Sequence, residues 1–218
     1  MKQMGSIHWL GHASFLIKAA GTTIYIDPYE GDYTEAAALI LVTHSHHDHC
    51  DASKIQMIRR DDTVIVAPAD CASRIGGPVR SLKPGDRAVV GPVTIEAVDA
   101  YNYKRFRSPG VPYHPKSLGV GYLITVDGKT VYHAGDTDFI PEMKRLRDKH
   151  IDVALLPSGG TYTMDNPEAA EAALAINPKA VMPMHRWDTN PADFKRAVEA
   201  KSRIKVVTLQ PGEHFTIP

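Results

Sequence analysis

The residues best suited to chemistry are the histidines and carboxylates between positions 44 and 49. The chain has 11 histidines, and four of them fall in the run His44-Ser-His46-His47-Asp48-His49. His44 and His46, two residues apart on an extended turn, can point their imidazoles the same way. Asp48 and His49 follow as the chain turns toward a helix. Because neutral imidazole and carboxylate suit zinc, iron or manganese, the run predicts a metal site rather than a solvated turn.

Two distant residues are candidate partners for this cluster. Asp136 lies in the turn 134–137 (AGDT), and His185 ends the segment 181–185 (VMPMH). Each follows an apolar run typical of a strand, at whose end site loops often converge. Taken alone, Asp136 would as readily cap a turn, and His185 would as readily bond the backbone. The cluster at 44–49 is what makes both of them candidate ligands.

An apolar run, Leu39–Thr43, directly precedes the cluster and is typical of a strand buried on both faces. The chain also contains a weak internal repeat, in which Gly21–Asp27 parallels Gly128–His133. Each copy precedes a carboxylate-bearing turn and, later, an apolar strand that ends in a candidate site loop. Two similar β-rich halves facing one another would place both sets of loops at one edge.

The bulk composition predicts one domain, residues 1–218, with enough apolar residues (43%) for a substantial core. Lysine plus arginine equal aspartate plus glutamate at 25 each, so no broad polyanion-binding surface is indicated and nucleic acid is not an expected partner. Cys50 and Cys71 form no disulfide framework. The segment 1–10 has no signal-peptide core, and no apolar run reaches the roughly 20 residues of a membrane span. We therefore expect a cytoplasmic protein without membrane attachment.

Several motifs together resemble the metallo-β-lactamase superfamily. They are His-x-His-x-Asp-His at 44–49, Ile26-Asp27-Pro28, the turn 134–137 and Pro183-Met184-His185. Two further segments, 9–15 (WLGHASF) and 132–137 (YHAGDT), resemble the branch that includes the L-ascorbate-phosphate lactonase. The resemblance spans nearly the whole chain, and its motifs occur in the family's order.

The resemblance implies a mixed α/β fold, a four-layer αββα sandwich with the site along one edge of the paired sheets. It also implies a metal-dependent hydrolase with two divalent metal ions, zinc first and manganese or iron as alternatives. The first metal would be held by His44 and His46, and the second by Asp48, His49 and His185. Asp136 would bridge the two ions, and Asp27 would orient a ligand histidine or the loop.

The sequence departs from the family pattern after the expected strand 93–98, where another histidine ligand is usual. Three alternatives arise for this position. Asp99 is the ligand, which is the preferred reading and would favour a harder ion such as manganese. Otherwise His114 folds back to supply a nitrogen, or Asn102 takes the histidine's place and leaves the first metal loosely held.

The segment 101–115 is the longest irregular stretch, and long loops inside compact domains are often functional. It carries aromatic and cationic groups suited to a phosphorylated or carboxylated small molecule. The predicted substrate-binding residues are Tyr101, Asn102, Lys104, His114 and Lys116, with Arg105, Arg107 and Tyr113 beside them. His12 and His133 are interpreted as residues that orient others.

The function predicted from these residues is hydrolysis by metal-activated hydroxide. Asp48 and Asp27 are the predicted catalytic carboxylates, with Asp48 orienting the hydroxide while the metals stabilise the oxyanion. The expected substrate is a small lactone or ester, phosphorylated or not. Two alternatives stay open, a phosphodiesterase of the same fold and a metal-binding protein without turnover. The oligomeric state, monomer or homo-oligomer, also stays open.

Overall fold

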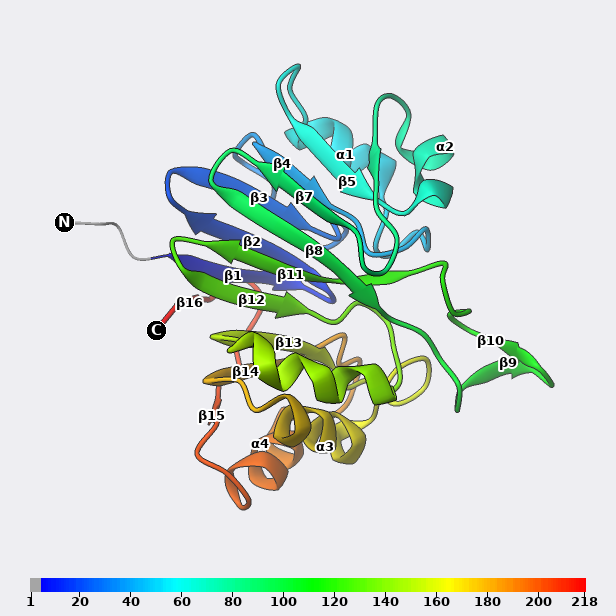
Figure 1. Ribbon diagram of the computed structural model, residues 1–218, viewed down its shortest axis with the longest axis vertical. Coiled ribbons are helices and arrows are strands. Elements are labelled where there is room, and N and C mark those ends of the chain that lie inside the picture. Colours follow the sequence, from blue (N-terminus) through cyan, green and yellow to red (C-terminus); the bar gives the residue numbers. More distant parts are fainter. Residues whose placement is uncertain (1–4) are drawn as a thin grey trace.

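Residues 5–218, the part of the chain that the computed structural model describes, build two seven-stranded sheets and a small separate hairpin (Figure 1). In spatial order the first sheet consists of β16 (His214–Thr216), β1 (Ser6–Gly11), β2 (Ser14–Ala19), β3 (Thr22–Ile26), β4 (Leu39–Leu41), β5 (Val64–Ala67) and β6 (Arg80–Ser81). The second consists of β15 (Lys205–Val206), β14 (Ala180–Met184), β13 (Val153–Pro157), β12 (Lys129–His133), β11 (Val120–Val126), β8 (Val93–Asp99) and β7 (Arg87–Val90). The hairpin consists of β9 (Phe106–Ser108) and β10 (Val111–Pro112).

The two sheets share one plan, which explains the internal repeat in the sequence. In the first, β2 and β3 form an antiparallel hairpin, and β4 and β5 then add in parallel to β3. In the second, β11 and β12 form the hairpin, and β13 and β14 add in parallel. Asp127 and Gly128 both adopt positive φ, as the two-residue turn between β11 and β12 requires. The predicted equivalence of the two halves therefore holds at the level of strand pairing.

Apolar side chains from both sheets meet in the largest core, which includes Phe15, Leu41, Ile95, Tyr122 and Leu155. The outer faces are covered by helices. The first sheet carries α1 (Ala52–Ile58), η1 (Ala69–Cys71) and α2 (Ala72–Ile75), and the second carries η2 (Pro141–Lys149), α3 (Asn166–Ile176) and α4 (Pro191–Glu199). The predicted four-layer αββα sandwich is confirmed.

Local capping explains where the helices begin. Asp51 accepts hydrogen bonds from the backbone N–H groups of Ser53 and Lys54, so it caps α1. Asp165 caps α3, because its carboxylate accepts from the N–H of Glu168. The segment predicted to be irregular, 101–115, contains the β9–β10 hairpin.

Strands of both sheets end at one edge of the sandwich. Asp27 follows β3, the cluster at 44–49 begins three residues after the last residue of β4, and Asp136 and His185 follow β12 and β14. Near this edge the buried hydroxyl of Tyr122 on β11 donates to the carbonyl of Val42 at 2.9 Å, which ties the second sheet to the first. The topology thus brings together residues that lie far apart in the sequence.

None of the helices within residues 5–218 has the length and apolar character needed to cross a bilayer. Residues 1–4 of the predicted domain lie outside the described part of the chain.

We predict that Tyr122→Phe lowers the free energy of unfolding by about 1 kcal/mol, because it leaves the buried Val42 carbonyl without this donor. Tyr25→Phe is the matched control, since the Tyr25 hydroxyl donates at 3.2 Å to the carbonyl of Glu35 at a partly buried position. Urea denaturation of the metal-loaded proteins measures both. Equal stability of Tyr122→Phe and wild type would show that the inter-sheet hydrogen bond is dispensable.

Candidate metal centre

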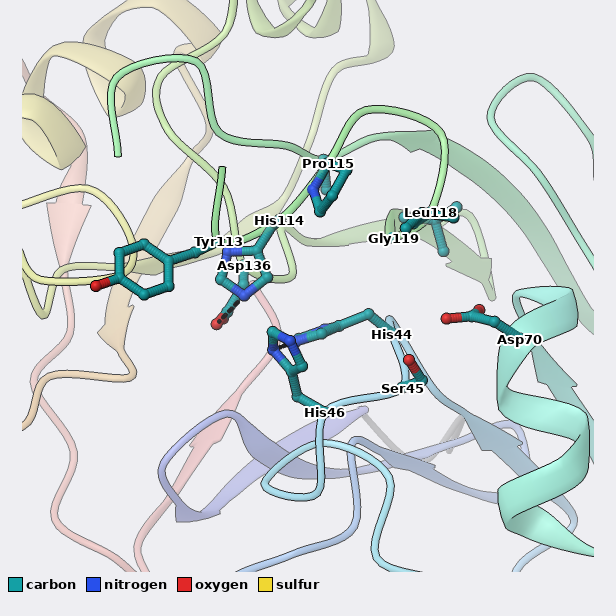
Figure 2. A pocket seen from close by; sticks show the side chains of 12 residues that line it. His44, Ser45, His46, Asp70, Tyr113, His114, Pro115, Leu118, Gly119 and Asp136 are labelled. Carbon is teal, nitrogen blue, oxygen red and sulfur yellow. Dashed lines mark hydrogen bonds and ion pairs between the residues drawn. The ribbon is translucent and has the colours of Figure 1, made fainter. Parts of the chain in front are cut away.

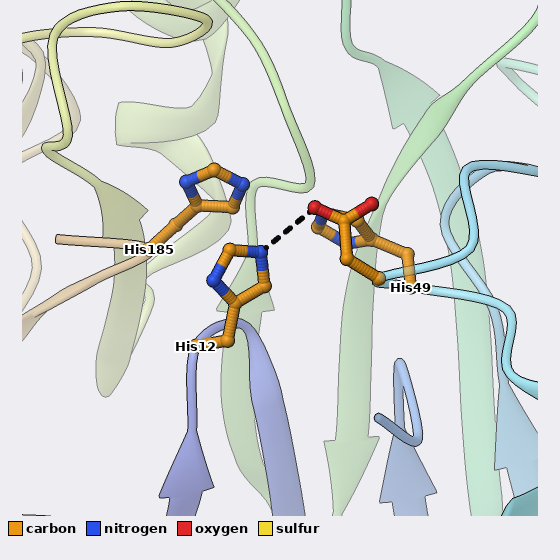
Figure 3. A group of neighbouring side chains, drawn as sticks. His12, His49 and His185 are labelled. Carbon is orange, nitrogen blue, oxygen red and sulfur yellow. Dashed lines mark hydrogen bonds and ion pairs between the residues drawn. The ribbon is translucent and has the colours of Figure 1, made fainter. Parts of the chain in front are cut away.

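Two groups of metal-binding side chains face one another at the shared edge of the sheets. The first group is His44, His46 and His114, and the second is His12, Asp48, His49 and His185. Within each group the available ligand atoms all lie within 4.8 Å of one another. Figure 3 shows the rings of His12, His49 and His185 side by side. Each group has the size and donor chemistry of a site for one divalent ion.

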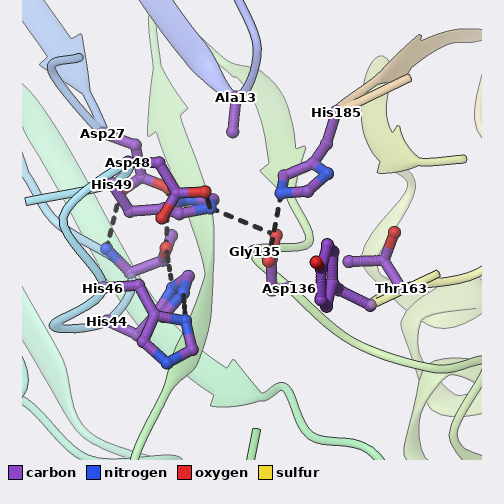
Figure 4. A network of polar contacts seen from close by, with 12 residues as sticks. Ala13, Asp27, His44, His46, Asp48, His49, Gly135, Asp136, Thr163 and His185 are labelled. Carbon is purple, nitrogen blue, oxygen red and sulfur yellow. Dashed lines mark hydrogen bonds and ion pairs between the residues drawn. The ribbon is translucent and has the colours of Figure 1, made fainter. Parts of the chain in front are cut away.

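Asp136 lies between the two groups. Its Oδ2 is 3.2 Å from Nε2 of His114 in the first group and 3.2 Å from Nε2 of His185 in the second. Its Oδ1 is 3.4 Å from Nε2 of His49 (Figure 4). A single carboxylate thus contacts ligands of both groups, as a bridging residue must.

The hydrogen-bonding inventory indicates that these atoms are arranged for a metal. Buried polar atoms are normally paired. Here the buried atoms Nε2 of His49, Nε2 of His114, Oδ1 of Asp136 and both ring nitrogens of His185 have no hydrogen-bond partner among the described residues. They belong to the residues that gather at the edge, so the residues present fit divalent metal ions.

The charge states of His44, Asp136 and Asp48 suit metal binding, whereas Asp136 and Asp27 raise the pKa of His49 well above its usual value although burial alone would lower it. Burial, reinforced by the proximity of His49, lowers the pKa of His44 well below its usual value, which leaves a neutral imidazole at neutral pH. Burial alone would raise the pKa of Asp136, but His185 and His49 hold it well below its usual range. Burial alone would also raise the pKa of Asp48, but the hydrogen bond from His12 holds that pKa below its usual value. Neutral imidazoles and anionic carboxylates are the protonation states that ligands need.

Asp27 holds the histidine cluster in place from behind. Its fully buried carboxylate accepts from the backbone N–H of Thr43 at 2.7 Å, from the Thr43 hydroxyl at 2.6 Å and from Nδ1 of His49 at 2.7 Å. Because Nδ1 of His49 carries the shared proton, Nε2 keeps its lone pair for a ligand. Asp27 was predicted both to be catalytic and to orient a ligand histidine or the loop. Its contacts with Thr43 and His49 fit the orienting role, and the catalytic role stays a prediction.

Asn102 holds the ring of His114 in place from behind, as Asp27 holds that of His49. Its Oδ1 accepts from the backbone N–H of His114 at 3.0 Å and from Nδ1 of the ring at 2.6 Å. Its Nδ2 donates to Oδ1 of Asp138 at 3.0 Å and to the carbonyl of Tyr162. The ring of His114 is therefore held with Nε2 directed at Asp136. Asn102, predicted to bind substrate or to replace a ligand, lies behind a ligand instead.

The structure decides between the alternatives for the missing histidine. His114 joins His44 and His46 in the first group, whereas Asp99 is not among the grouped residues. Asp99 lines a separate hollow with Glu142 and Lys149, so its prediction as a metal ligand is corrected. The backbone of Asn102 bonds the carbonyl of His114, and this pairing folds the loop back toward the site. The expected preference for manganese depended on Asp99 as a ligand, and Asp99 is not grouped with His44 and His46.

The other side chains predicted to bind substrate form ion pairs or hydrogen bonds with carboxylates away from the metal-binding groups. Lys104 pairs with Glu168 at 2.9 Å, while Lys116 at 2.9 Å and the Tyr101 hydroxyl at 3.0 Å both contact Glu142. Neither hollow beside the metal-binding groups is lined by Tyr101, Lys104 or Lys116. Carboxylates on α3 and η2, which the sequence did not place opposite these cations, draw them away from the site.

The two histidines interpreted as orienting residues have different surroundings. Both ring nitrogens of His133 form hydrogen bonds with the backbone. Nε2 is 2.9 Å from the carbonyl oxygen of Ala13, and Nδ1 accepts from the N–H of Gly135. His12 lies within the second donor group, its Nε2 3.1 Å from Oδ2 of Asp48. His133 therefore shapes the turn that carries Asp136, and His12 contacts a candidate ligand directly.

A cavity of about 50 Å³ opens beside the first donor group. Figure 2 shows His44, His46, His114 and Asp136 on one side of it and Leu118 and Pro115 on another. Tyr113 also lines it. The reacting end of a small substrate would therefore meet metal-binding groups opposite apolar side chains.

Three groups near the site were not singled out from the sequence. Asp138, next to the recognised turn, accepts from the backbone N–H groups of Tyr103 and Lys104, which anchors the loop that carries His114. Arg186 and Trp187 directly follow His185. Their proximity to a predicted ligand was the only signal in the sequence, and it does not specify where their side chains lie.

A family model described as the beta-lactamase superfamily domain matches residues 6–185. A UPF0173 metal-dependent hydrolase of Thermococcus kodakarensis is 38% identical, and the match covers 98% of this chain and 100% of that protein. The crystal structure of a metal-dependent hydrolase from Parabacteroides distasonis superposes with a TM-score of 0.86 at 39% identity, over 93% of this chain and 91% of the other. A metallo hydrolase of Ignicoccus hospitalis has a TM-score of 0.82 at 28% identity, over 99% of both chains.

We predict that His114→Ala reduces the metal content by about one equivalent per chain, because it removes one of three donors from the first group. Asp99→Ala, the matched control on the preceding strand, should leave the content unchanged. Inductively coupled plasma mass spectrometry of the purified proteins measures both. Loss of metal from Asp99→Ala with retention in His114→Ala would reverse the assignment.

Asn102→Ala should weaken metal binding by about 10- to 100-fold, because the His114 ring loses the acceptor that orients it. Competition with a chromophoric chelator measures the affinity. Asn166→Ala is the control, since Asn166 is also a buried asparagine but donates to the carbonyl of Asn190 on α4's cap. An equal loss of affinity in both variants would mean that the effect is general destabilisation.

Proposed function

The chain belongs to the beta-lactamase superfamily and is a metal-dependent hydrolase, and we propose that it cleaves an ester or lactone bond in a small molecule, using two divalent metal ions. Zinc is the proposed metal, because each donor set is built mainly of imidazoles with few carboxylates. With His114 in place of Asp99, the first group consists of three imidazole donors.

The observation that carries the proposal is the position of Asp136. Its two carboxylate oxygens contact histidines of both donor groups, and buried nitrogen atoms on either side have no other partner. A single metal would leave one of the two groups with buried, unpaired polar atoms, which is costly. Two ions sharing Asp136 would satisfy both groups.

Bound in these groups, divalent ions would act as Lewis acids and lower the pKa of water toward neutrality. The chain's own contribution is orientation. Asp48 is partly exposed. The hydrogen bond from His12 holds its Oδ2, and its Oδ1, which lies 3.8 Å from Nδ1 of the exposed His47 ring, would accept a proton from the attacking water. Asp27 and Asn102 keep the ring nitrogens of His49 and His114 directed inward.

The surroundings support a small substrate rather than a polymer. The cavity beside His44 and His114 is narrow and is lined on one side by Leu118 and Pro115. The chain is electrically neutral, with 25 residues of each sign, and so lacks the excess positive charge that commonly accompanies nucleic-acid binding. An acyl centre in a compact molecule fits this space better than an internal linkage of nucleic acid.

A substrate panel tests the proposal. The metal-loaded wild type should hydrolyse a lactone or a carboxylic ester faster than bis-p-nitrophenyl phosphate or a β-lactam. Asp48→Asn should lower kcat/KM by about 10²- to 10⁴-fold, since it removes a positioned proton acceptor. His47→Ala is the control from the same motif, because the His47 ring is largely exposed and outside both donor groups, and its solvent-exposed contact with Asp48, 3.8 Å between Nδ1 and Oδ1, contributes little.

Chelation should abolish turnover, and readdition of zinc should restore it. Preference for the phosphodiester would replace the ester assignment with phosphodiesterase activity. A protein that carries two metals and turns over no member of the panel would contradict the proposal and support a metal-binding role without hydrolysis.

A further inference from the structure

Arg186 is a buried cation with no carboxylate partner in the described part of the chain. Only 9% of its surface is exposed, and its guanidinium carbon lies 4.3 Å from the centre of the Trp9 ring. Nη2 donates to the carbonyl of Leu209 at 3.0 Å, whereas Nη1 has no hydrogen-bond partner among residues 5–218. Because arginine stays protonated in proteins, the site holds a positive charge that no carboxylate contacts among residues 5–218.

This cation lines the larger hollow near the metal centre, a cavity of about 320 Å³. Trp9 and Trp187, the only tryptophans in the chain, contribute aromatic walls. Trp187 has a φ of +48°, a conformation that bulky residues rarely adopt. Its side chain is 57% exposed, although an indole of this size usually packs into the protein. Strain and exposure together are typical of a functional position.

The cavity reaches the metal centre through His12, which lines it. The centroids of the His12 and His185 rings are 3.9 Å apart, and Nε2 of His12 is 3.1 Å from Oδ2 of Asp48. The Trp187 ring is 5.1 Å from the His12 ring and 5.5 Å from the His185 ring. A molecule that occupies this cavity therefore abuts the second donor group.

Aromatic side chains connect this cavity with the smaller one. The Trp187 ring is 6.3 Å from that of Tyr162, which in turn is 4.8 Å from that of Tyr113 in the wall of the smaller cavity. Tyr162 and Trp187 are both exposed. These three rings form a rim beside the donor groups along which a substrate can extend from one cavity to the other.

One carboxylate, that of Glu30, also lines the larger cavity. Glu30 is exposed to solvent, where water screens its charge, whereas Arg186 is buried. The buried charge therefore dominates the interaction with a ligand, and Glu30 weakens it.

We propose that the cavity lined by Arg186, Trp9 and Trp187 binds an anionic group, a carboxylate or a phosphate, of the molecule whose other end reaches the metal centre. An anion would compensate the Arg186 charge and offer an acceptor to a guanidinium that has no protein carboxylate. This inference rests on the proposed function for the identity of the ligand as a substrate. The anion-binding site itself does not depend on turnover.

Tryptophan fluorescence tests the proposal directly, because both tryptophans line the cavity. The metal-loaded protein is titrated with glutarate, with its neutral analogue glutaramide and with inorganic phosphate. Glutarate or phosphate should produce a saturable change in fluorescence. The ligand with the lower dissociation constant identifies the preferred anion, carboxylate or phosphate. Glutaramide should bind at least about tenfold more weakly.

Arg186→Gln should raise the dissociation constant for the anion at least about tenfold, and Glu30→Gln should lower it. Thermal unfolding followed by circular dichroism checks that Arg186→Gln folds. If it does not fold, the wild-type comparison of the charged glutarate with the neutral glutaramide decides. Equal binding of glutarate and glutaramide, or unchanged affinity in a folded Arg186→Gln, would overturn the proposal.

The outcome is separable from that of the substrate panel. Anion binding that depends on Arg186 supports this site even if no ester in the panel is cleaved. Conversely, cleavage of neutral esters without anion binding leaves the proposed hydrolase activity intact and removes only the anionic subsite.

Discussion

The structure depends on a buried carboxylate that contacts histidines from three segments of the chain. Asp136 follows β12 of the second sheet. Of the three histidines, His49 belongs to the loop after β4 of the first sheet, His114 lies beyond the β9–β10 hairpin, and His185 follows β14 of the second sheet. A charged group in this position is stable only if opposite or polar partners surround it. Because those partners come from both sheets, the face-to-face packing of the sheets and the assembly of the site are one requirement.

The ligand histidines are held by hydrogen bonds that are themselves buried. Asp27 binds His49 and fixes the backbone of Thr43, and Asn102 binds the ring and backbone of His114. Each contact determines which ring nitrogen keeps its proton, so the free nitrogen points toward Asp136. The chain thus prepares both donor groups by the same device, applied once from each half of the molecule.

The loop 101–115 acts as part of the scaffold as much as part of the pocket. Asp138 accepts from Arg105 at 2.6 Å and from two backbone N–H groups of the loop, while Glu168 on α3 accepts from Arg105 at 2.7 Å. This network fastens the loop, which contains the short β9–β10 hairpin, to the second sheet and its helices. The cations that suggested substrate binding are used for this attachment, and Arg186 is left as the buried cation near the metal-binding groups.

The sequence by itself predicted the two-sheet architecture and the candidate metal ligands that lie close together at positions 44–49. The repeat around Gly21–Asp27 and Gly128–His133, the apolar run before His44 and the resemblance of its motifs were sufficient for the four-layer sandwich. The short-range cluster at 44–49 was visible because its spacing is set by local backbone geometry.

Only the tertiary structure decided among Asp99, His114 and Asn102, and only it showed the role of Arg186. A loop's return path depends on contacts with residues distant in sequence, here Asp138 with the backbone of 103 and 104 and Asn102 with His114. Whether a cation is paired depends in the same way on which carboxylates the packed helices present. Lys104 and Lys116 meet Glu168 and Glu142, whereas no carboxylate reaches Arg186 within the described residues. These outcomes follow from the packing of whole elements, which local spacing does not specify.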